Sequence, residues 1–223
     1  MNLFGLSESD LFQGSYIGWR ENRIKKIEEI FEKEFFRNKS ILELGCGYGH
    51  VGKHFREILK SKVTFSDGNK SFIKYIQENN PDCEVLHLDQ DKPWNLNRKF
   101  DIIIHWGVLY HLDNWKEDLL SAMNHSNLIF LESEVANSDD ENYEFKLQDH
   151  DGYDQAVNIN ATRPSANFIE KIILQNNFSF KRYDDSSLNY NSHRYDWKVT
   201  NQTERIENYG NRRFWILEKN TKG

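Results

Sequence analysis

The sequence predicts an α/β fold with a doubly wound, seven-stranded sheet that is mostly parallel and has an antiparallel C-terminal strand. Short apolar runs alternate with helical segments between residues 40 and 132, which is typical of a parallel sheet with helices on both faces. The runs 178–183 and 212–217 alternate apolar with polar residues, which favours an antiparallel pair at the sheet edge.

Each predicted element rests on a local pattern. Apolar residues recur at helical spacing from Ile24 to Phe35, which predicts an N-terminal lid helix over about 18–36. The run 100–105 is almost continuously apolar, as a parallel strand buried on both faces should be. The predicted strands are 40–44, 62–66, 84–88, 100–105, 127–132, 178–183 and 212–217, and the predicted helices are 50–60, 70–79, 114–124 and 165–177.

Two segments, 135–163 and 184–211, are longer than ordinary connections in a compact domain. Both leave the carboxyl ends of predicted strands, which is where open α/β sheets bind ligands. We therefore expect both segments, together with the lid helix, to roof a pocket.

Glu43 and the glycines Gly45, Gly47 and Gly49 follow the first predicted strand at alternate positions. Glycine has no Cβ, so such a turn brings bare backbone and a helix N-terminus close to a ligand. The dinucleotide fingerprint G-x-G-x-x-G places its third glycine one residue later, and Glu43 would repel a phosphate. A ligand with a cationic amine and hydroxyls is favoured.

This turn resembles the first motif of class I S-adenosylmethionine (SAM)-dependent methyltransferases, which have a Rossmann-like fold. Later features follow in the matching order: Asp67 and Asp89 each end a predicted strand. The run Gly107-Val108-Leu109-Tyr110-His111 is similar to the fourth-motif region of small-molecule and tRNA wobble-uridine methyltransferases. The resemblance covers about residues 40–219.

The resemblance implies SAM as cofactor and S-adenosylhomocysteine (SAH) as product. The Asp67 carboxylate would accept hydrogen bonds from two ribose hydroxyls, and Asp89, or Asp91 as a fallback, from the adenine amino group. Arg20 would hold the methionyl carboxylate. The expected cofactor-binding residues are Tyr16, Arg20, Glu43, Gly45, Gly47, Gly49, Asp67, Asp89, Gln90 and Trp106.

Methyl transfer mainly requires alignment of the nucleophile with the methyl group, and an oxygen or nitrogen nucleophile also needs a base. His111, just past the fourth strand, is the first candidate base, although a packing role fits it equally well. His150, flanked by Asp149 and Asp151, is the alternative, against a simple solvated loop.

Further polar residues are expected on the acceptor side: His105, Tyr110, Arg163 and Tyr195. Arg163 could clamp a carboxylate or phosphate of the acceptor, whereas His105 could simply be buried in its apolar strand. The acids after strand five, from Glu132 to Glu141, are of the type that binds hard cations, but acidic loops are usually just solvated. We predict no metal site.

We expect one methyltransferase domain over 1–223. Within it, 1–39 would form the lid, 40–134 the SAM-binding half, and 135–163 and 184–211 the substrate-side loops. The 223 residues suffice for one hydrophobic core. The sequence gives no indication of oligomeric state.

The net charge of −6 disfavours binding of long nucleic acids, which usually requires a basic face. The cluster Arg20, Arg23, Lys25 and Lys26 interleaves with glutamates, which indicates a solvated helix face. No run approaches the roughly 18 apolar residues of a membrane span, and neither a secretory signal nor a disulfide framework is visible. A cytoplasmic location is expected.

The predicted function is transfer of a methyl group from SAM to a hydroxyl or amine of a small polar acceptor, such as a sugar, glycan precursor or metabolite. One alternative is an RNA methyltransferase of the tRNA type, based on the run 107–111 and on the basic face of the lid helix. The other is a non-catalytic SAM- or SAH-binding module, because an intact cofactor motif implies binding only.

Overall fold

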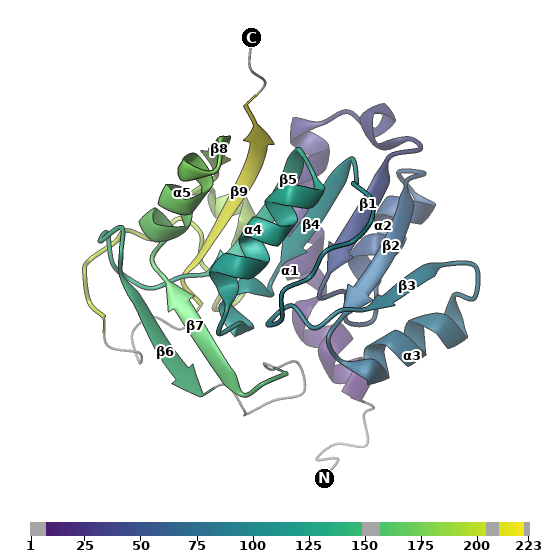
Figure 1. The fold of residues 1–223 in the computed structure, drawn as a ribbon, viewed down its shortest axis with the longest axis horizontal. Helices are drawn as coiled ribbons and strands as arrows, with labels where there is room; N and C mark the ends of the chain where they lie inside the picture. Colours follow the sequence, from purple (N-terminus) through teal and green to yellow (C-terminus); the bar gives the residue numbers. More distant parts are fainter. Residues whose placement is uncertain (1–7, 149–156, 204–209, 221–223) are drawn as a thin grey trace.

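A seven-stranded sheet forms the centre of the computed structural model, which describes residues 8–148, 157–203 and 210–220 (Figure 1). The strand order is β3-β2-β1-β4-β5-β9-β8. Among the described strands of this sheet, β9 is antiparallel to both of its neighbours, and the other strands all run in the same direction. The predicted fold class is therefore confirmed. The strands are β1 (Ser40–Leu44), β2 (Lys62–Asp67), β3 (Glu84–His87), β4 (Ile102–Trp106), β5 (Leu128–Glu134), β8 (Phe178–Arg182) and β9 (Arg212–Lys219).

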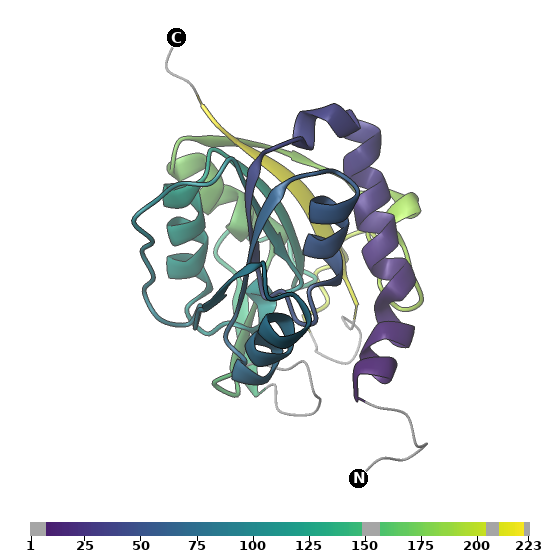
Figure 2. The same ribbon diagram turned by 90° about the vertical axis from the view of Figure 1, so that its right-hand side faces the viewer.

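Helices cover both faces of this sheet (Figure 2). Alternate side chains of each strand enter different cores: Ile102 and Ile104 pack on the face of α1 and α2, whereas Ile103 packs on the face of α4 and α5. This burial on both sides explains why the strand sequences are continuous apolar runs. The helices are α1 (Glu8–Ile30), α2 (His50–Glu57), α3 (Lys70–Asn79), α4 (Trp115–His125) and α5 (Ala166–Gln175), with short 3-10 turns η1 (Lys33–Phe36), η2 (Leu109–His111) and η3 (Ser186–Leu188).

The predicted lid helix differs from α1 in its bounds. It begins ten residues earlier, at Glu8 rather than 18, and ends at Ile30 before the separate turn η1. It runs along one face of the sheet (Figure 2) and buries Ile27 completely in the core. The apolar periodicity from Ile24 to Phe35 indicated neither the start of the helix at Glu8 nor its end before η1. Among the described residues, no helix is both long and apolar enough to cross a bilayer.

The first long segment is not an irregular loop. It contains an antiparallel pair, β6 (Glu144–Gln148) and β7 (Asn160–Pro164), which projects from the edge of the main sheet that also carries the carboxyl ends of its parallel strands (Figure 1). The alternation of apolar and polar residues in Glu144–Gln148 is the signal that the sequence analysis missed.

The C-terminal strands form the predicted antiparallel pair at one end of the sheet, in which β8 is the edge strand and β9 lies between β5 and β8. Six consecutive residues of β9, from Arg212 to Leu217, are buried. Both sides of this strand are therefore buried, and each side accepts one arginine, Arg212 on one and Arg213 on the other.

A buried polar network ties α4 to the sheet and to the loop after β3. The Asp118 carboxylate lies 2.6 Å from His105 Nε2 on β4 and accepts hydrogen bonds from Trp94 Nε1 (2.8 Å) and Gln90 Nε2 (3.1 Å). His105 and Asp118 are fully buried as side chains. One carboxylate thus accepts hydrogen bonds from, or pairs with, three buried polar groups.

We expect Asp118→Ala to lower the free energy of unfolding by about 3 kcal/mol, because it leaves buried donors without an acceptor. Glu117→Ala, an exposed neighbour on the same helix turn, should cost less than about 1 kcal/mol. Denaturant unfolding of the two variants measures the difference. Equal losses would contradict a structural role for the network.

Candidate active site

The backbone of the glycine turn after β1 has a conformation that residues with a side chain rarely adopt. Gly45, Gly47 and Gly49 have φ angles of 60°, 52° and 74°, all in the left-handed region that favours glycine. A Cβ on Gly45 would lie 2.1 Å from a methyl carbon of Val108. A Cβ on Gly49 would lie 2.5 Å from Ile76 Cδ1, so Gly49 serves close packing of α2 rather than facing the cavity.

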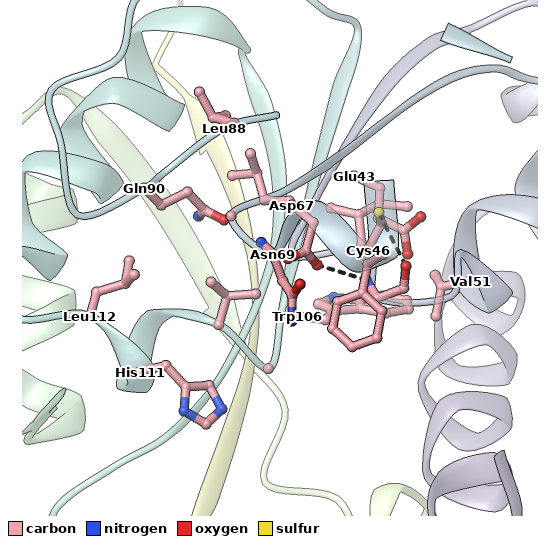
Figure 3. A pocket seen from close by; sticks show the side chains of 18 of the residues that line it. Glu43, Cys46, Val51, Asp67, Asn69, Leu88, Gln90, Trp106, His111 and Leu112 are labelled. Atoms are coloured by element: carbon pink, nitrogen blue, oxygen red, sulfur yellow. Dashed lines mark hydrogen bonds between the residues drawn. The ribbon is translucent and has the colours of Figure 1, made fainter. Parts of the chain in front are cut away.

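This turn borders a cavity at the carboxyl ends of the parallel strands (Figure 3). One wall comes from the ends of β1, β2 and β3, a second from the segment after β4, and a third from α1. Among the described residues of the two long segments, Val157 alone reaches the lining, and none of those in 184–211 does so. The polar and aromatic lining residues are Tyr16, Trp19, Arg20, Arg23, Glu43, His50, Asp67, Asn69, Phe72, Asp89, Gln90, Asp91, Trp106, Tyr110 and His111.

Asp67, at the end of β2, braces the glycine turn. Its Oδ2 accepts a hydrogen bond from the Gly47 amide at 2.9 Å, drawn in Figure 3, and its Oδ1 accepts one from the Asn69 amide at 2.7 Å. Burial raises the pKa of Asp67, and these two amides oppose the shift. Each carboxylate oxygen keeps a further lone pair for a ligand hydroxyl.

Glu43 is the buried acid below the turn. Burial raises its pKa to about 8, against the hydrogen bond from the Gly52 amide and the nearby charge of Arg20. The protonated form therefore predominates at neutral pH. A cationic group placed next to Glu43 would favour its carboxylate form.

Asp89 and Asp91, which follow β3, differ in how far their carboxylates are already occupied by groups of the protein. Asp89 lines the cavity and pairs with the exposed Lys92 at 2.7 Å. Asp91 also lines it, but its Oδ1 already accepts hydrogen bonds from the amides of Asp113 and Asn114. Asp89 is therefore freer than the fallback Asp91 to contact a ligand.

Helix α1 turns one face into the cavity. Tyr16, Trp19, Arg20 and Arg23 lie at positions i, i+3, i+4 and i+7 and all line it, since residues at this spacing share one face of a helix. Arg20, Arg23 and Lys26 are buried. The predicted solvated basic face is therefore wrong for these three residues, because arginine and lysine pair with acids and aromatic rings inside the protein.

Behind this face lies a buried ionic cluster around Glu132, at the end of β5. Its Oε2 accepts a hydrogen bond from Arg23 at 3.2 Å, and its Oε1 accepts from Arg212 at 3.1 Å and from the Tyr195 hydroxyl at 3.0 Å. Trp19 Nε1 donates to the same hydroxyl at 2.7 Å. The guanidinium of Arg23 stacks on the Trp19 ring at 3.7 Å, a geometry that stabilises a desolvated cation.

A second ionic contact continues the cluster. Arg163 on β7 donates to Glu134 at 2.9 Å and to the carbonyl oxygen of Tyr110. Arg212 lies 3.8 Å from the other Glu134 oxygen and donates to the Tyr110 hydroxyl at 3.1 Å. Glu132 and Glu134, which were considered above as possible metal ligands, are thus paired with arginines.

Several residues expected to contact the acceptor lie elsewhere. His105 and Tyr195 are completely buried, with Asp118 and Glu132 as their partners, and neither lines the cavity. The expectation that they touch the acceptor does not match these positions. Arg163 likewise lies behind the cavity, pairing with Glu134 rather than facing the mouth.

Of the two candidate bases, His111 lines the cavity and His150 lies outside the described residues. His111 ends η2, and its ring lies 4.1 Å from that of Tyr110. Figure 3 shows it on the opposite side of the cavity from Glu43. Tyr110 also lines the cavity, with its pKa raised by burial.

The sequence analysis missed Arg23, Arg212 and Trp19 as parts of the site. The heptad-like spacing of Tyr16, Trp19 and Arg23 on one helix face could have indicated a shared surface. Nothing local distinguishes Arg212, whose partners come from β5 and η2.

The chain has relatives among characterised methyltransferases. It is 30% identical over 135 residues to the histidine protein methyltransferase 1 homolog of Dictyostelium discoideum, covering 54% of this chain and 43% of that protein. It is 29% identical over 132 residues to the tRNA U34 carboxymethyltransferase of Campylobacter fetus subsp. fetus (strain 82-40), covering 55% and 45% respectively. The chain thus spans less than half the length of these curated relatives.

Solved structures share the fold over almost the whole chain. The DhpI–SAH complex matches with a TM-score of 0.61 at 14% identity, covering 96% of this chain and 91% of that one. The N-terminal domain of EvdMO1, in the presence of SAH and D-fucose, matches with a TM-score of 0.65 at 12% identity, covering 91% and 84%. Residues 16–191 match the family model described as a methyltransferase domain. The protein therefore belongs to this methyltransferase family, whose fold is that of the SAM-dependent, class I Rossmann-like enzymes.

Proposed function

We propose that this protein transfers a methyl group from SAM to a hydroxyl or amine of a small polar acceptor. The observation that carries the proposal is the cavity between the glycine turn and α1, with acids on one side and arginines and aromatic rings on the other. SAM is the cofactor of this family.

The residues at the turn suit SAM chemically. The backbone at Gly45 borders the cavity, and a side chain there would collide with Val108, which also lines it. Asp67 offers acceptors for ribose hydroxyls, Glu43 a carboxylate for an amine, and Leu88 and Leu112 an apolar surface for adenine. When bound, SAM supplies the electrophilic methyl group, while these side chains hold and orient it.

The acceptor would meet the wall formed by α1, Trp106, Tyr110 and His111. This wall can align a nucleophile next to the methyl group, which is the main requirement of the reaction. His111 is the candidate base within it. His150 remains an untested alternative.

A small acceptor fits better than RNA. The basic residues of α1 that would meet a phosphate backbone are mostly buried, as Arg20, Arg23 and Lys26 are. The similarity to a tRNA U34 carboxymethyltransferase keeps RNA as the second candidate. A non-catalytic module would bind SAH but form none from SAM.

Label transfer tests the proposed reaction. Protein with [methyl-³H]SAM and fractionated cell extract should label small molecules, and His111→Ala should lose at least about tenfold in turnover while binding SAH normally. Label in RNA would favour the second candidate, and no label despite tight SAH binding would favour the module. Full turnover in His111→Ala would remove His111 as the base.

Asp67→Ala should weaken SAH binding by at least about tenfold, because it removes the hydroxyl acceptors and the brace on Gly47. Asp82→Ala, an exposed acid beyond α3, is the matched control and should bind as the wild type does. Calorimetric titration measures both. A folded Asp67→Ala protein with unchanged affinity would refute the assignment.

SAH affinity should rise between pH 6 and 8. The raised pKa of Glu43, about 8, keeps this acid mostly protonated below that pH, and only its carboxylate form attracts the ligand amine. Well below the pKa of Glu43, the SAH affinity should rise by about tenfold per pH unit. Glu43→Gln should bind with little pH dependence over the same range. A wild-type affinity that is flat from pH 6 to 8 would show that Glu43 does not contact the amine.

A further inference from the structure

The segment that follows β3 carries three consecutive polar residues, Asp89, Gln90 and Asp91, and all three line the cavity. At the start of this segment, the Leu88 amide donates to the carbonyl oxygen of Asp67 at 3.0 Å. The segment therefore lies directly beside the acid that offers acceptors for the ribose hydroxyls. A base attached to that ribose would come to lie against it.

Every carboxylate oxygen of the two acids in this segment already has a partner in the protein. Asp89 pairs with Lys92 through Oδ2 at 2.7 Å and accepts the Asp91 amide through Oδ1 at 3.2 Å. Asp91 accepts two backbone amides through Oδ1, and Asn158 Nδ2 through Oδ2 at 3.1 Å. Each of these oxygens therefore keeps at most one lone pair for a ligand.

Gln90 differs from both neighbours because its side-chain oxygen is unoccupied. The residue is only 5% exposed, and its Nε2 donates to Asp118 Oδ1 at 3.1 Å. Among the described residues, no group donates to its Oε1. Figure 3 shows this side chain on the same side of the cavity as Leu88 and Leu112. Because Gln90 lines the cavity, its oxygen is available to a ligand.

Asp118 determines which way round the Gln90 amide lies. Its Oδ1 also accepts from Trp94 Nε1 at 2.8 Å, and an indole nitrogen can only donate. This acceptor oxygen must face the NH2 group of Gln90, because it would repel the amide oxygen. Asp118 is itself held in the core by His105 at 2.6 Å. The Gln90 oxygen thus points away from Asp118, and the second N–H of the amide is not used by Asp118.

The groups that Asp118 leaves available match one edge of an adenine base. Adenine presents an amino group, which donates, next to a ring nitrogen, which accepts. A glutamine amide pairs with this edge by accepting at its oxygen and donating from its nitrogen. A 6-oxopurine would instead set an acceptor against the Gln90 oxygen, and two acceptors without a proton between them repel each other.

We propose that Gln90 selects the adenine base of SAM by accepting a hydrogen bond from its amino group, and that Asp118 is a positioning residue for Gln90. This role rests on the proposed function and deepens it, since it requires SAM in the cavity. Gln90 would thereby take the contact that the sequence predicted for Asp89. Leu88 and Leu112 would pack against the faces of the base.

Two ligands that differ only at the base test the role of Gln90. In calorimetric titrations the wild type should bind SAH at least about tenfold more tightly than S-inosylhomocysteine, in which a 6-oxo group replaces the amino group. Gln90→Leu should lower the SAH affinity at least about tenfold and change the S-inosylhomocysteine affinity less than about threefold. Gln77→Leu, at an exposed position of α3, is the matched control and should bind both ligands as the wild type does.

Asp118→Ala tests the positioning role. The variant frees the Gln90 amide to turn, so that its nitrogen can donate to a 6-oxo group. The preference for SAH over S-inosylhomocysteine should therefore fall at least about fivefold, measured at a temperature where the variant remains folded. A purely structural role would weaken binding of both ligands equally, so an unchanged preference would refute the positioning role.

Equal affinity of the wild type for the two ligands would overturn the inference while SAH binding stands. A folded Gln90→Leu protein that keeps the preference would do the same, and Gln90→Met replaces this variant if it does not fold. A preference lost in Asp89→Ala but kept in Gln90→Leu would return the contact to Asp89. Absence of SAH binding to the wild type would overturn the proposed function and this inference with it.

Discussion

The buried carboxylate of Glu132 is the group on which the geometry of the site depends. It is inaccessible to water at the end of β5, and hydrogen bonds from Arg23, Arg212 and Tyr195 occupy both of its oxygens. A charge in such a place is tolerated only when it is paired and hydrogen-bonded. Satisfying it requires α1, β9 and the segment before β9 to meet at one point of the sheet.

This requirement determines how α1 presents its inner face. Hydrophobic packing of Ile27 and its neighbours is not directional and alone would leave the rotation of the helix loosely defined. The bonds of Arg23 to Glu132 and of Trp19 to Tyr195 have direction and length. They fix the rotation of α1, and with it the wall that an acceptor would meet.

The sequence was sufficient for the fold because the fold depends on local signals, and the predicted cofactor-binding residues rest on signals of the same kind. Apolar strands, the glycine turn and the strand-end acid Asp67 can be recognised within short windows, and the structure brings Glu43, Gly47 and Asp67 together. The acceptor side depends on contacts between residues far apart in the chain, such as Glu132 with Arg212. For the same reason His105 was mistaken for a contact residue: its partner Asp118 lies on the next helix.

The charged residues that line the cavity differ from one wall to the other. Acids from the strand ends line one wall, and Arg20 and Arg23 of α1 line another. Charges in a site shielded from water act with little screening, so the acids would attract the cationic groups of SAM. Transfer of a methyl cation equivalent onto an electron-rich acceptor disperses charge. A dry site with fixed, preorganised charges favours such a step, because no solvent has to reorganise around it.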